Sequence, residues 1–315
     1  MEYISGLVSV IVPTYKRCDT LTRCINSVLN QTYQKIELIV VNDNVVGDEY
    51  SQQLYRLIDQ YSDERLIFVE QEKHINGAAA RNVGIKRARG EYIAFNDDDD
   101  YWEPQKIERQ VSLLSGLDES WGAVSCLMRI YDKDKLLESL LPYRDGSILI
   151  DILERRTSMG TGSLLIRHRA LDNVGYFDES LIRHQDLQLF ACLTEKYKVK
   201  LDRVYLHNRD VQDAQNRPDA VKMIEVKKAF FRSIKPIMKR LKYSDRKKVL
   251  IMHEFEIAYH VYKSGNKKEG IQRALTILKT PATCWLAFDR SIKRLFQKKF
   301  CRQLEKKYSI KIVGE

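Results

Sequence analysis

The hydrophobic positions of the first hundred residues form short apolar runs, separated by segments with helical periodicity. The runs are rich in β-branched residues and contain few charges, which is typical of strands buried in a parallel sheet. Between the first two runs, Leu21, Cys24, Ile25 and Val28 fall on one helical face of residues 20–31. A strand, a helix and a second strand in this order predict a right-handed crossover and an α/β fold. The predicted strands are Leu7 to Pro13, Ile36 to Val41, Arg65 to Val69 and Tyr92 to Phe95, and two more helices are predicted at 49–62 and from Asn76 onward.

The pattern changes at about Val221, beyond which lysine-rich helical periodicity replaces the strand pattern. Residues 247–263 and 267–279 predict a helical hairpin, because Ser264-Gly265-Asn266 between them is a turn sequence. We therefore expect an α/β domain over residues 1–221 and a separate helical module over 222–315.

The net charge of +10 is divided unequally between these two parts. Residues 222–315 contain 25 Lys/Arg and 8 Asp/Glu, a net charge of +17, which leaves −7 for residues 1–221. A basic segment of this kind can contact nucleic acid, anionic lipid or an acidic substrate, and its charge alone does not choose among them. No stretch of 18 uncharged apolar residues and no signal-peptide pattern is present, and the six cysteines are scattered without metal-site spacing. These features favour a cytoplasmic protein.

Four consecutive aspartates, Asp97 to Asp100, directly follow the fourth predicted strand. Adjacent carboxylates repel one another, and a divalent cation would stabilise them. In an extended segment Asp97 and Asp99 would point to the same side with Cα atoms about 6.6 Å apart, which suits one ion. A calcium-binding EF-hand loop is excluded, because Tyr101 and Trp102 stand where that loop needs a ligand and a glycine. The alternative is a solvated acidic turn.

Polar residues also follow the second predicted strand, at Asn42-Asp43-Asn44. The carboxyl ends of parallel strands are where open α/β sheets place ligand contacts, and an Asx turn or a helix cap is the alternative for Asn42 and Asn44. Arg81, early in the third predicted helix, has two interpretations. It is either a solvated helix residue or a cation directed at a phosphate or a base.

Four blocks in order, Val8 to Tyr15, Glu37 to Asp43, Asn76 to Asn82 and Gly90 to Trp102, resemble the nucleotide-binding half of glycosyltransferase family 2, which has the GT-A fold: a Rossmann-like, mainly parallel sheet between helices. The resemblance assigns residues 1–102 to nucleotide binding and 103–221 to the acceptor. The chain departs from the family at two places. Asn42 stands where the family often has a second aspartate, and Val45-Val46-Gly47 stands in place of a short Gly-Ser turn. Both departures lie at the rim of the expected base pocket.

The resemblance also implies roles for single residues. Asp97-Asp98-Asp99 matches the DXD element of the family, which implies a manganese or magnesium ion (Mn2+ or Mg2+) held by Asp99 and Asp97, with Asp97 and Asp98 also contacting the nucleotide sugar. Pro13, Thr14, Tyr15 and Asp43 would line the base and ribose pocket, and Arg81 would contact the nucleotide.

The second half resembles the family more weakly, through Met159 to Ile166 and Gly175 to Leu181. The next block, His184-Gln185-Asp186, places Asp186 where the family has its catalytic carboxylate, while many relatives have an acidic residue in place of Gln185. If the segments that resemble the family are set aside, the simpler interpretation of Asp186 is an aspartate in the first turn of a helix, where the macrodipole stabilises its charge.

The resemblance implies an inverting transferase that moves a sugar from a nucleotide-diphosphate sugar, with UDP as the first choice, to a hydroxyl of a glycan or lipid-linked glycan in cell-surface polysaccharide synthesis. Two alternatives are weaker. A nucleotidyltransferase would need a glycine-rich phosphate loop after the first strand, where Pro13 to Arg17 has no glycine. A non-catalytic nucleic-acid-binding module would need the aromatic and glycine motifs of an RNA-binding sheet. We therefore expect no nucleic-acid partner.

The last predicted helix, Trp285 to Lys307, carries an apolar and aromatic stripe surrounded by lysine and arginine. Such a helix is suited to the interface of an anionic membrane, and docking onto the rest of the protein is the equal alternative. We expect a cytoplasmic protein that contacts the cytoplasmic face of the membrane peripherally.

Overall fold

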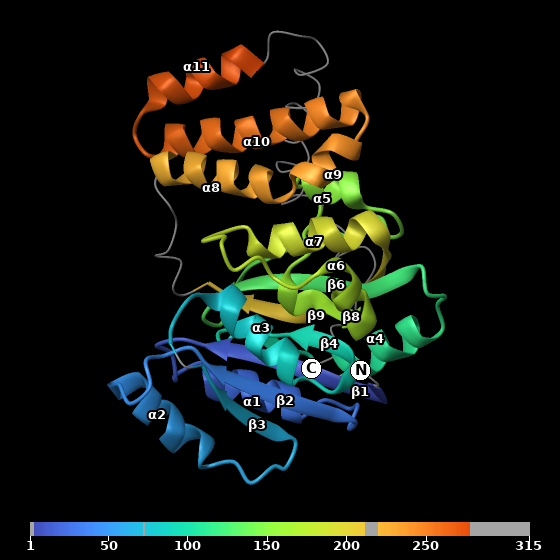
Figure 1. The fold of residues 1–315 in the computed structure, drawn as a ribbon. Helices are drawn as coiled ribbons and strands as arrows, with labels where there is room; N and C mark the ends of the chain where they lie inside the picture. The colour runs from blue at the N-terminus through green and yellow to red at the C-terminus, as the bar shows by residue number, and fades with distance from the viewer. Residues whose placement is uncertain (1–2, 72, 212–219, 278–315) are drawn as a thin grey trace. The chain divides into compact units, whose positions relative to one another are not determined.

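The computed structural model describes residues 3–71, 73–211 and 220–277. Its main feature is a nine-stranded mixed sheet, in which eight strands follow the order β3-β2-β1-β4-β8-β6-β9-β5 and β7 pairs with β6. The first half of the chain supplies the parallel part, β3-β2-β1-β4, and Figure 1 shows these strands in blue and cyan among their helices. This half comprises β1 (Ile4–Thr14), α1 (Leu21–Leu29), β2 (Ile36–Asn42), α2 (Glu49–Ile58), β3 (Leu66–Glu70), α3 (Gly77–Arg87) and β4 (Gly90–Phe95). Every strand and helix predicted in this half is confirmed.

Helices cover both faces of this parallel part because side chains alternate along β1. Val8, Val10 and Val12 point to one face and form a core with α1, α2 and α4. Ile11 points to the other face, where its side chain would lie 2.4 Å from a Cβ atom at Gly84 of α3. Only glycine allows α3 to approach β1 this closely.

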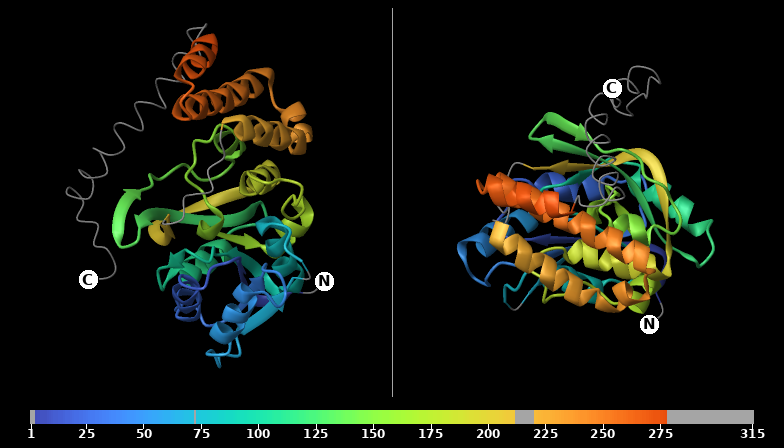
Figure 2. Two further views of the ribbon diagram at one scale, coloured as in Figure 1. Left: turned by 90° about the vertical axis from the view of Figure 1, so that its left-hand side faces the viewer. Right: turned by 90° about the horizontal axis from the view of Figure 1, so that it is seen from above.

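The second half extends the sheet with antiparallel pairs. β8 pairs with β4 and with β6, while the long strands β6 and β9 run parallel to each other (Figure 2). The antiparallel pair of β5 with β9 brings the segment after the acidic run beside His207 and Asn208. The elements are β5 (Tyr101–Trp102), α4 (Lys106–Ser115), β6 (Trp121–Asp132), β7 (Lys135–Ser139), α5 (Leu149–Leu153), the 3-10 turn η1 (Thr161–Ser163), β8 (Leu164–Arg167), α6 (His168–Val174), α7 (Gln185–Lys196) and β9 (Lys198–Asp210).

The chain forms two compact units. Among the described residues, one unit comprises 3–71, 73–211 and 229–239, and the other comprises 220–228 and 240–277. Compactness does not assign a function to either unit, so the functional division at residue 221 stays a prediction. The helices that follow β9 along the chain are α8 (Ala220–Ser233), α9 (Lys235–Arg240), α10 (Tyr243–Lys263) and α11 (Lys267–Ile277).

The predicted helical hairpin is confirmed as α10 and α11. The two helices approach closely at Gly270, where a Cβ atom would lie 2.7 Å from the Cβ atom of Tyr262. Lys227 and Glu256 form an ion pair of 2.7 Å inside the same unit. No helix among the described residues is both long enough and apolar enough to cross a bilayer. The predicted amphipathic helix at 285–307 lies outside the described residues.

Candidate active site

The acidic run forms a turn at the end of β4. The N–H of Asp100 donates to the carbonyl of Asp97 over 3.0 Å. The predicted extended segment is therefore wrong, because a turn lets adjacent carboxylates reach different partners. Asp98 faces the loop after β1, where its Oδ2 lies 3.4 Å from the Tyr15 amide nitrogen. Asp97, Asp99 and Asp100 each present one carboxylate oxygen, and these oxygens all lie within 4.8 Å of one another.

The protonation behaviour of these carboxylates reflects burial and crowding. Burial, and then the charge of Asp99, raises the pKa of Asp98 to about 7. Burial and the neighbouring Asp100 and Asp97 raise the pKa of Asp99 to about 6. Desolvation also raises the pKa of Asp97, but the charge and hydrogen bond of Arg81 outweigh it and leave that pKa below its ordinary value. The run therefore holds more negative charge than its own surroundings stabilise, which favours a bound cation.

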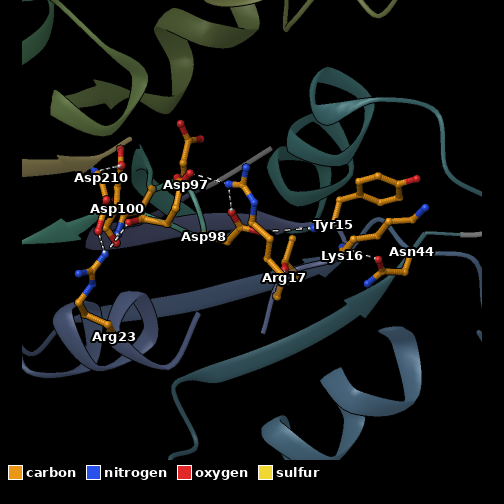
Figure 3. Close-up of polar contacts among 12 residues, drawn as sticks. Tyr15, Lys16, Arg17, Arg23, Asn44, Asp97, Asp98, Asp100 and Asp210 are labelled. Atoms are coloured by element: carbon orange, nitrogen blue, oxygen red, sulfur yellow. Dashed lines mark hydrogen bonds and ion pairs between the residues drawn. The ribbon is translucent and has the colours of Figure 1, made fainter. Parts of the chain in front are cut away.

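Two arginines from different elements contact the run. Arg17, in the loop after β1, has Nη1 at 3.3 Å from Asp98 Oδ1 and 2.5 Å from Asp99 Oδ2 (Figure 3). Arg81 of α3 has Nη2 at 2.5 Å from Asp97 Oδ1, and its side chain is only 15% exposed. The interpretation of Arg81 as a solvated helix residue is therefore wrong. Both guanidinium groups lie where an anionic ligand of the acidic site would need positive charge.

Two residues of β9 contact Asp100, and Arg23 of α1 contacts one of them. His207 Nε2 lies 2.8 Å from Asp100 Oδ2, and the N–H of Asp210 donates to Asp100 Oδ1 over 3.2 Å. Arg23 pairs with Asp210 at 2.9 Å, and Figure 3 shows this pair beside Asp100. Burial lowers the pKa of His207 to about 3, so its imidazole is neutral. A Cβ atom at Gly162 would lie 2.5 Å from His207 Nε2, so only glycine leaves room for the ring.

The residues expected around the base and ribose come together at the ends of β1 and β2. Pro13 and Thr14 lie opposite Val41 and Asn42 in the sheet register. The N–H of Asp43 donates to the Thr14 carbonyl over 2.9 Å. Burial raises the pKa of Asp43, against the opposing effect of His74.

His74 adds an unpredicted side chain to this group. Its ring stacks on Tyr15 with centroids 4.0 Å apart and planes 12° from parallel.

Asn42 makes a local turn contact, whereas the side chain of Asn44 contacts the loop after β1. The Asn42 side-chain oxygen accepts from the N–H of Asn44 over 3.0 Å, and Asn44 Oδ1 accepts from the N–H of Lys16 over 2.7 Å. The Asn42 contact fits the Asx-turn alternative, and the Asn44 contact joins the loops after β1 and β2. They also fix the backbone that presents Asp43.

Asp186 lies in the first turn of α7, as predicted. Its Oδ1 accepts from the N–H of Leu187 over 2.7 Å. His184, the N-cap residue of α7, has a left-handed backbone with φ of 63°. Among the described contacts none joins Asp186 to the acidic run, so its role as the base stays a prediction.

The roles of several residues of the site could not be predicted from the sequence. Asp100 belongs to the acidic run, yet only the turn makes it a third member of the oxygen cluster. His207 and Asp210 stand more than a hundred residues further along the chain, in a strand whose sequence resembles no motif. His74 precedes the Asn76 block closely, but nothing local marks it as the partner of Asp43.

The donor set fits a divalent cation. Three carboxylate oxygens within 4.8 Å of one another are hard ligands of the kind that Mg2+ and Mn2+ prefer. The raised pKa values of Asp98 and Asp99 agree with this, because a cation would relieve the repulsion that contributes to them.

The sequence profile of the family described as "Glycosyl transferase family 2" matches residues 9–177, more than half of the chain. The chain belongs to this family. An uncharacterized glycosyltransferase of Rickettsia typhi is 33% identical over 228 residues, which cover 70% of this chain and 69% of the relative. The Escherichia coli enzyme WfaP, a UDP-Glc:alpha-D-GlcNAc-diphosphoundecaprenol beta-1,3-glucosyltransferase, is 37% identical over 108 residues, or 34% of this chain and 41% of WfaP. This family membership makes the chain a glycosyltransferase and disfavours the nucleotidyltransferase alternative.

Solved structures of low sequence identity confirm the GT-A fold. Residues 1–349 of Staphylococcus aureus TarS in complex with UDP-GlcNAc superpose with a TM-score of 0.61 at 17% identity, covering 86% of this chain and 80% of that TarS fragment. The mannosyltransferase PcManGT from Pyrobaculum calidifontis, in complex with GDP-Man and Mn2+, gives a TM-score of 0.58 at 20% identity, covering 91% and 80% of the two chains.

Proposed function

We propose that this glycosyltransferase is inverting and metal-dependent, and that it uses a nucleotide-diphosphate sugar, with UDP as the first choice. The observation that carries the proposal is the cluster of Asp97, Asp99 and Asp100 oxygens beside two arginines at the end of β4. The diphosphate of a sugar nucleotide is negatively charged. The aspartates can bind a metal ion that neutralises this charge, and the two arginines supply further positive charge. Relatives of the same fold were solved with UDP-GlcNAc or with GDP-Man and Mn2+, which supports the same donor class here.

Asp97 and Asp99, together with Asp100, would hold the metal ion. When bound, the ion would supply positive charge that stabilises the departing nucleoside diphosphate. Arg17 and Arg81 add charge from the protein itself, because their guanidinium groups already reach the carboxylates at this site. His207 and the Asp210 N–H keep Asp100 in place, so the cluster is held before the donor arrives.

Asp186 would act as the general base. It would take the proton of an acceptor hydroxyl while that oxygen attacks the anomeric carbon from the face opposite the leaving group, which inverts the configuration. One catalytic carboxylate is sufficient for this reaction, whereas glycoside hydrolysis needs two. The family resemblance of residues 175–186 supports the assignment.

The acceptor would be a hydroxyl of a glycan or a lipid-linked glycan in cell-surface polysaccharide synthesis. WfaP and a second E. coli relative, WfgD, are named for a diphosphoundecaprenol-linked acceptor, which supports this class. We also propose a cytoplasmic location with peripheral contact to an anionic membrane, for which residues 222–315 with a net charge of +17 would supply attraction. The absence of a nucleic-acid partner stays a prediction.

The metal assignment is tested with Asp99→Asn. The substitution removes one charge at almost constant shape, so we expect loss of sugar transfer and weaker Mn2+-dependent binding of UDP in calorimetry. Asp134→Asn, in the exposed turn between β6 and β7, is the matched control and should behave like the unchanged protein. Full turnover in Asp99→Asn would refute the metal assignment.

A further inference from the structure

Four side chains form a connected group at the edge of the site where β1 and β2 end. The rings of Tyr15 and His74 stack with centroids 4.0 Å apart. His74 Nδ1 lies 3.1 Å from Asp43 Oδ2, and Gln71 Nε2 donates to Asp43 Oδ1 over 2.8 Å. Tyr15 and Asp43 are the residues that the family resemblance assigns to the base and ribose pocket, whereas His74 and Gln71 have no assigned role.

The carboxylate of Asp43 is already committed inside this group. Its side chain is only 3% exposed, and each of its two oxygens has a partner, Gln71 on Oδ1 and His74 on Oδ2. Gln71 is fixed by a second bond from Nε2 to the Lys73 carbonyl over 2.7 Å. Both carboxylate oxygens of Asp43 therefore already have a partner within the group.

His74 is the more accessible member, with 34% of its side chain exposed. Two acceptors face its Nδ1, the Asp43 carboxylate and the Asp43 carbonyl oxygen at 3.0 Å, so Nδ1 carries the hydrogen. In this tautomer the lone pair of the ring lies on Nε2, on the other side of the imidazole. Among the described residues, none is hydrogen-bonded to Nε2. The group therefore presents one hydrogen-bond acceptor of fixed orientation, His74 Nε2, beside the stacked rings of Tyr15 and His74.

We propose that His74 is a specificity-determining residue that reads the base of the donor through Nε2, while Asp43 is a positioning residue that fixes the tautomer. Uracil and guanine present an imino N–H, at N3 and N1, which Nε2 can accept. Cytosine and adenine have a lone pair at the corresponding ring nitrogen, which would face the lone pair of Nε2. The site thus selects uridine or guanosine diphosphate sugars. This inference rests on the proposed function, because it assumes a nucleotide-sugar donor.

The test is calorimetric binding of UDP, GDP, CDP and ADP to the full chain in the presence of Mn2+. The unchanged protein should bind UDP or GDP at least about tenfold more tightly than CDP and ADP, the effect of one hydrogen bond whose partner is otherwise left unsatisfied. His74→Phe keeps an aromatic ring against Tyr15 but has no Nε2, so this preference should disappear. His74→Gln restores a side-chain oxygen acceptor and should recover part of it.

Asp43→Asn separates the two roles. Its amide oxygen can still accept from His74 Nδ1–H, so the preference for an imino base should persist, although overall affinity falls. His260→Phe, the same chemical change in α10, is the matched control and should leave the preference unchanged.

Two results would overturn the inference. One is a preference that survives His74→Phe but is lost or reversed in Asp43→Asn, because Asp43 would then read the base. The other is a preference of the unchanged protein for CDP or ADP. Binding of none of the four nucleotides would instead refute the proposed function. Equal melting temperatures of the variants would show that the comparison concerns the site and not folding.

Discussion

Lys106, the first residue of α4, is a fully buried cation beneath the acidic site. Its Nζ donates to Gln110 Oε1 over 2.9 Å and lies 3.8 Å from the centroid of the Trp102 ring. No carboxylate is described in contact with it. Burial lowers the pKa of Lys106 from 10.5 to about 8, because a neutral amine needs less hydration than an ammonium ion.

This shift predicts how stability depends on pH. Between pH 8 and pH 10.5 the unfolded chain holds the proton more tightly than the folded chain does, so the Lys106 contribution to the free energy of unfolding rises with pH. At 1.36 kcal/mol per pH unit the whole window amounts to about 3 kcal/mol. Below pH 8 the full cost of burying the charge is present, and above pH 10.5 it is gone.

The perturbation is Lys106→Met, which keeps an unbranched side chain of similar length and removes the titrating group. Urea unfolding of both proteins is followed by tryptophan fluorescence at several pH values from 7.5 to about 10.5. Other groups titrate equally in both proteins, so the difference in unfolding free energy isolates Lys106. We expect the unchanged protein to gain about 3 kcal/mol relative to Lys106→Met across this window.

The same comparison for Lys86→Met, an exposed lysine of α3, should show no such dependence on pH. A difference between the unchanged protein and Lys106→Met that stays constant with pH would refute the reasoning. It would mean that Lys106 keeps its proton in the folded protein over the whole range, or that water reaches it.

Two further predictions concern the reaction and its location. Asp186→Asn removes the proton acceptor at nearly constant shape, so turnover should fall about 100-fold or more while UDP affinity in calorimetry stays similar. Reduced donor binding with unchanged turnover would instead assign Asp186 to the nucleotide site or to helix capping. Deletion of residues 284–315 should abolish co-sedimentation with anionic vesicles at low salt, and high salt should release the full chain, because each basic residue near such a surface contributes about 1 kcal/mol. Absence of vesicle binding by the full chain would contradict the membrane contact.

The order of strands and helices in the first half could be read from the sequence because it depends on local patterns. Runs such as Val8 to Val12 are apolar at every position, and buried parallel strands tolerate little else. The helical face of α1 likewise appears as apolar residues at spacings of three and four. The α10–α11 hairpin was predictable for the same reason.

The position of the acidic run was also predictable from the sequence. Four aspartates that directly follow a buried strand must lie at the carboxyl end of that strand, outside the apolar core. The sequence did not determine their conformation. The sequence of the acidic run is compatible with both a turn and an extended conformation. Which one forms depends on contacts with residues from distant parts of the chain. Arg17 approaches Asp98 and Asp99 only because β1 and β4 are neighbours in the sheet.

Only the tertiary structure decided the outer contacts of the site. His207 and Asp210 reach Asp100 because β5 pairs with β9, a pairing between segments a hundred residues apart. His74 reaches Asp43 because the chain returns after β3, which lies beside β2 in the sheet. Local propensity determines where strands and helices begin and end, whereas side-chain partners across the sheet depend on which strands pair, and that is settled by burial of the whole core.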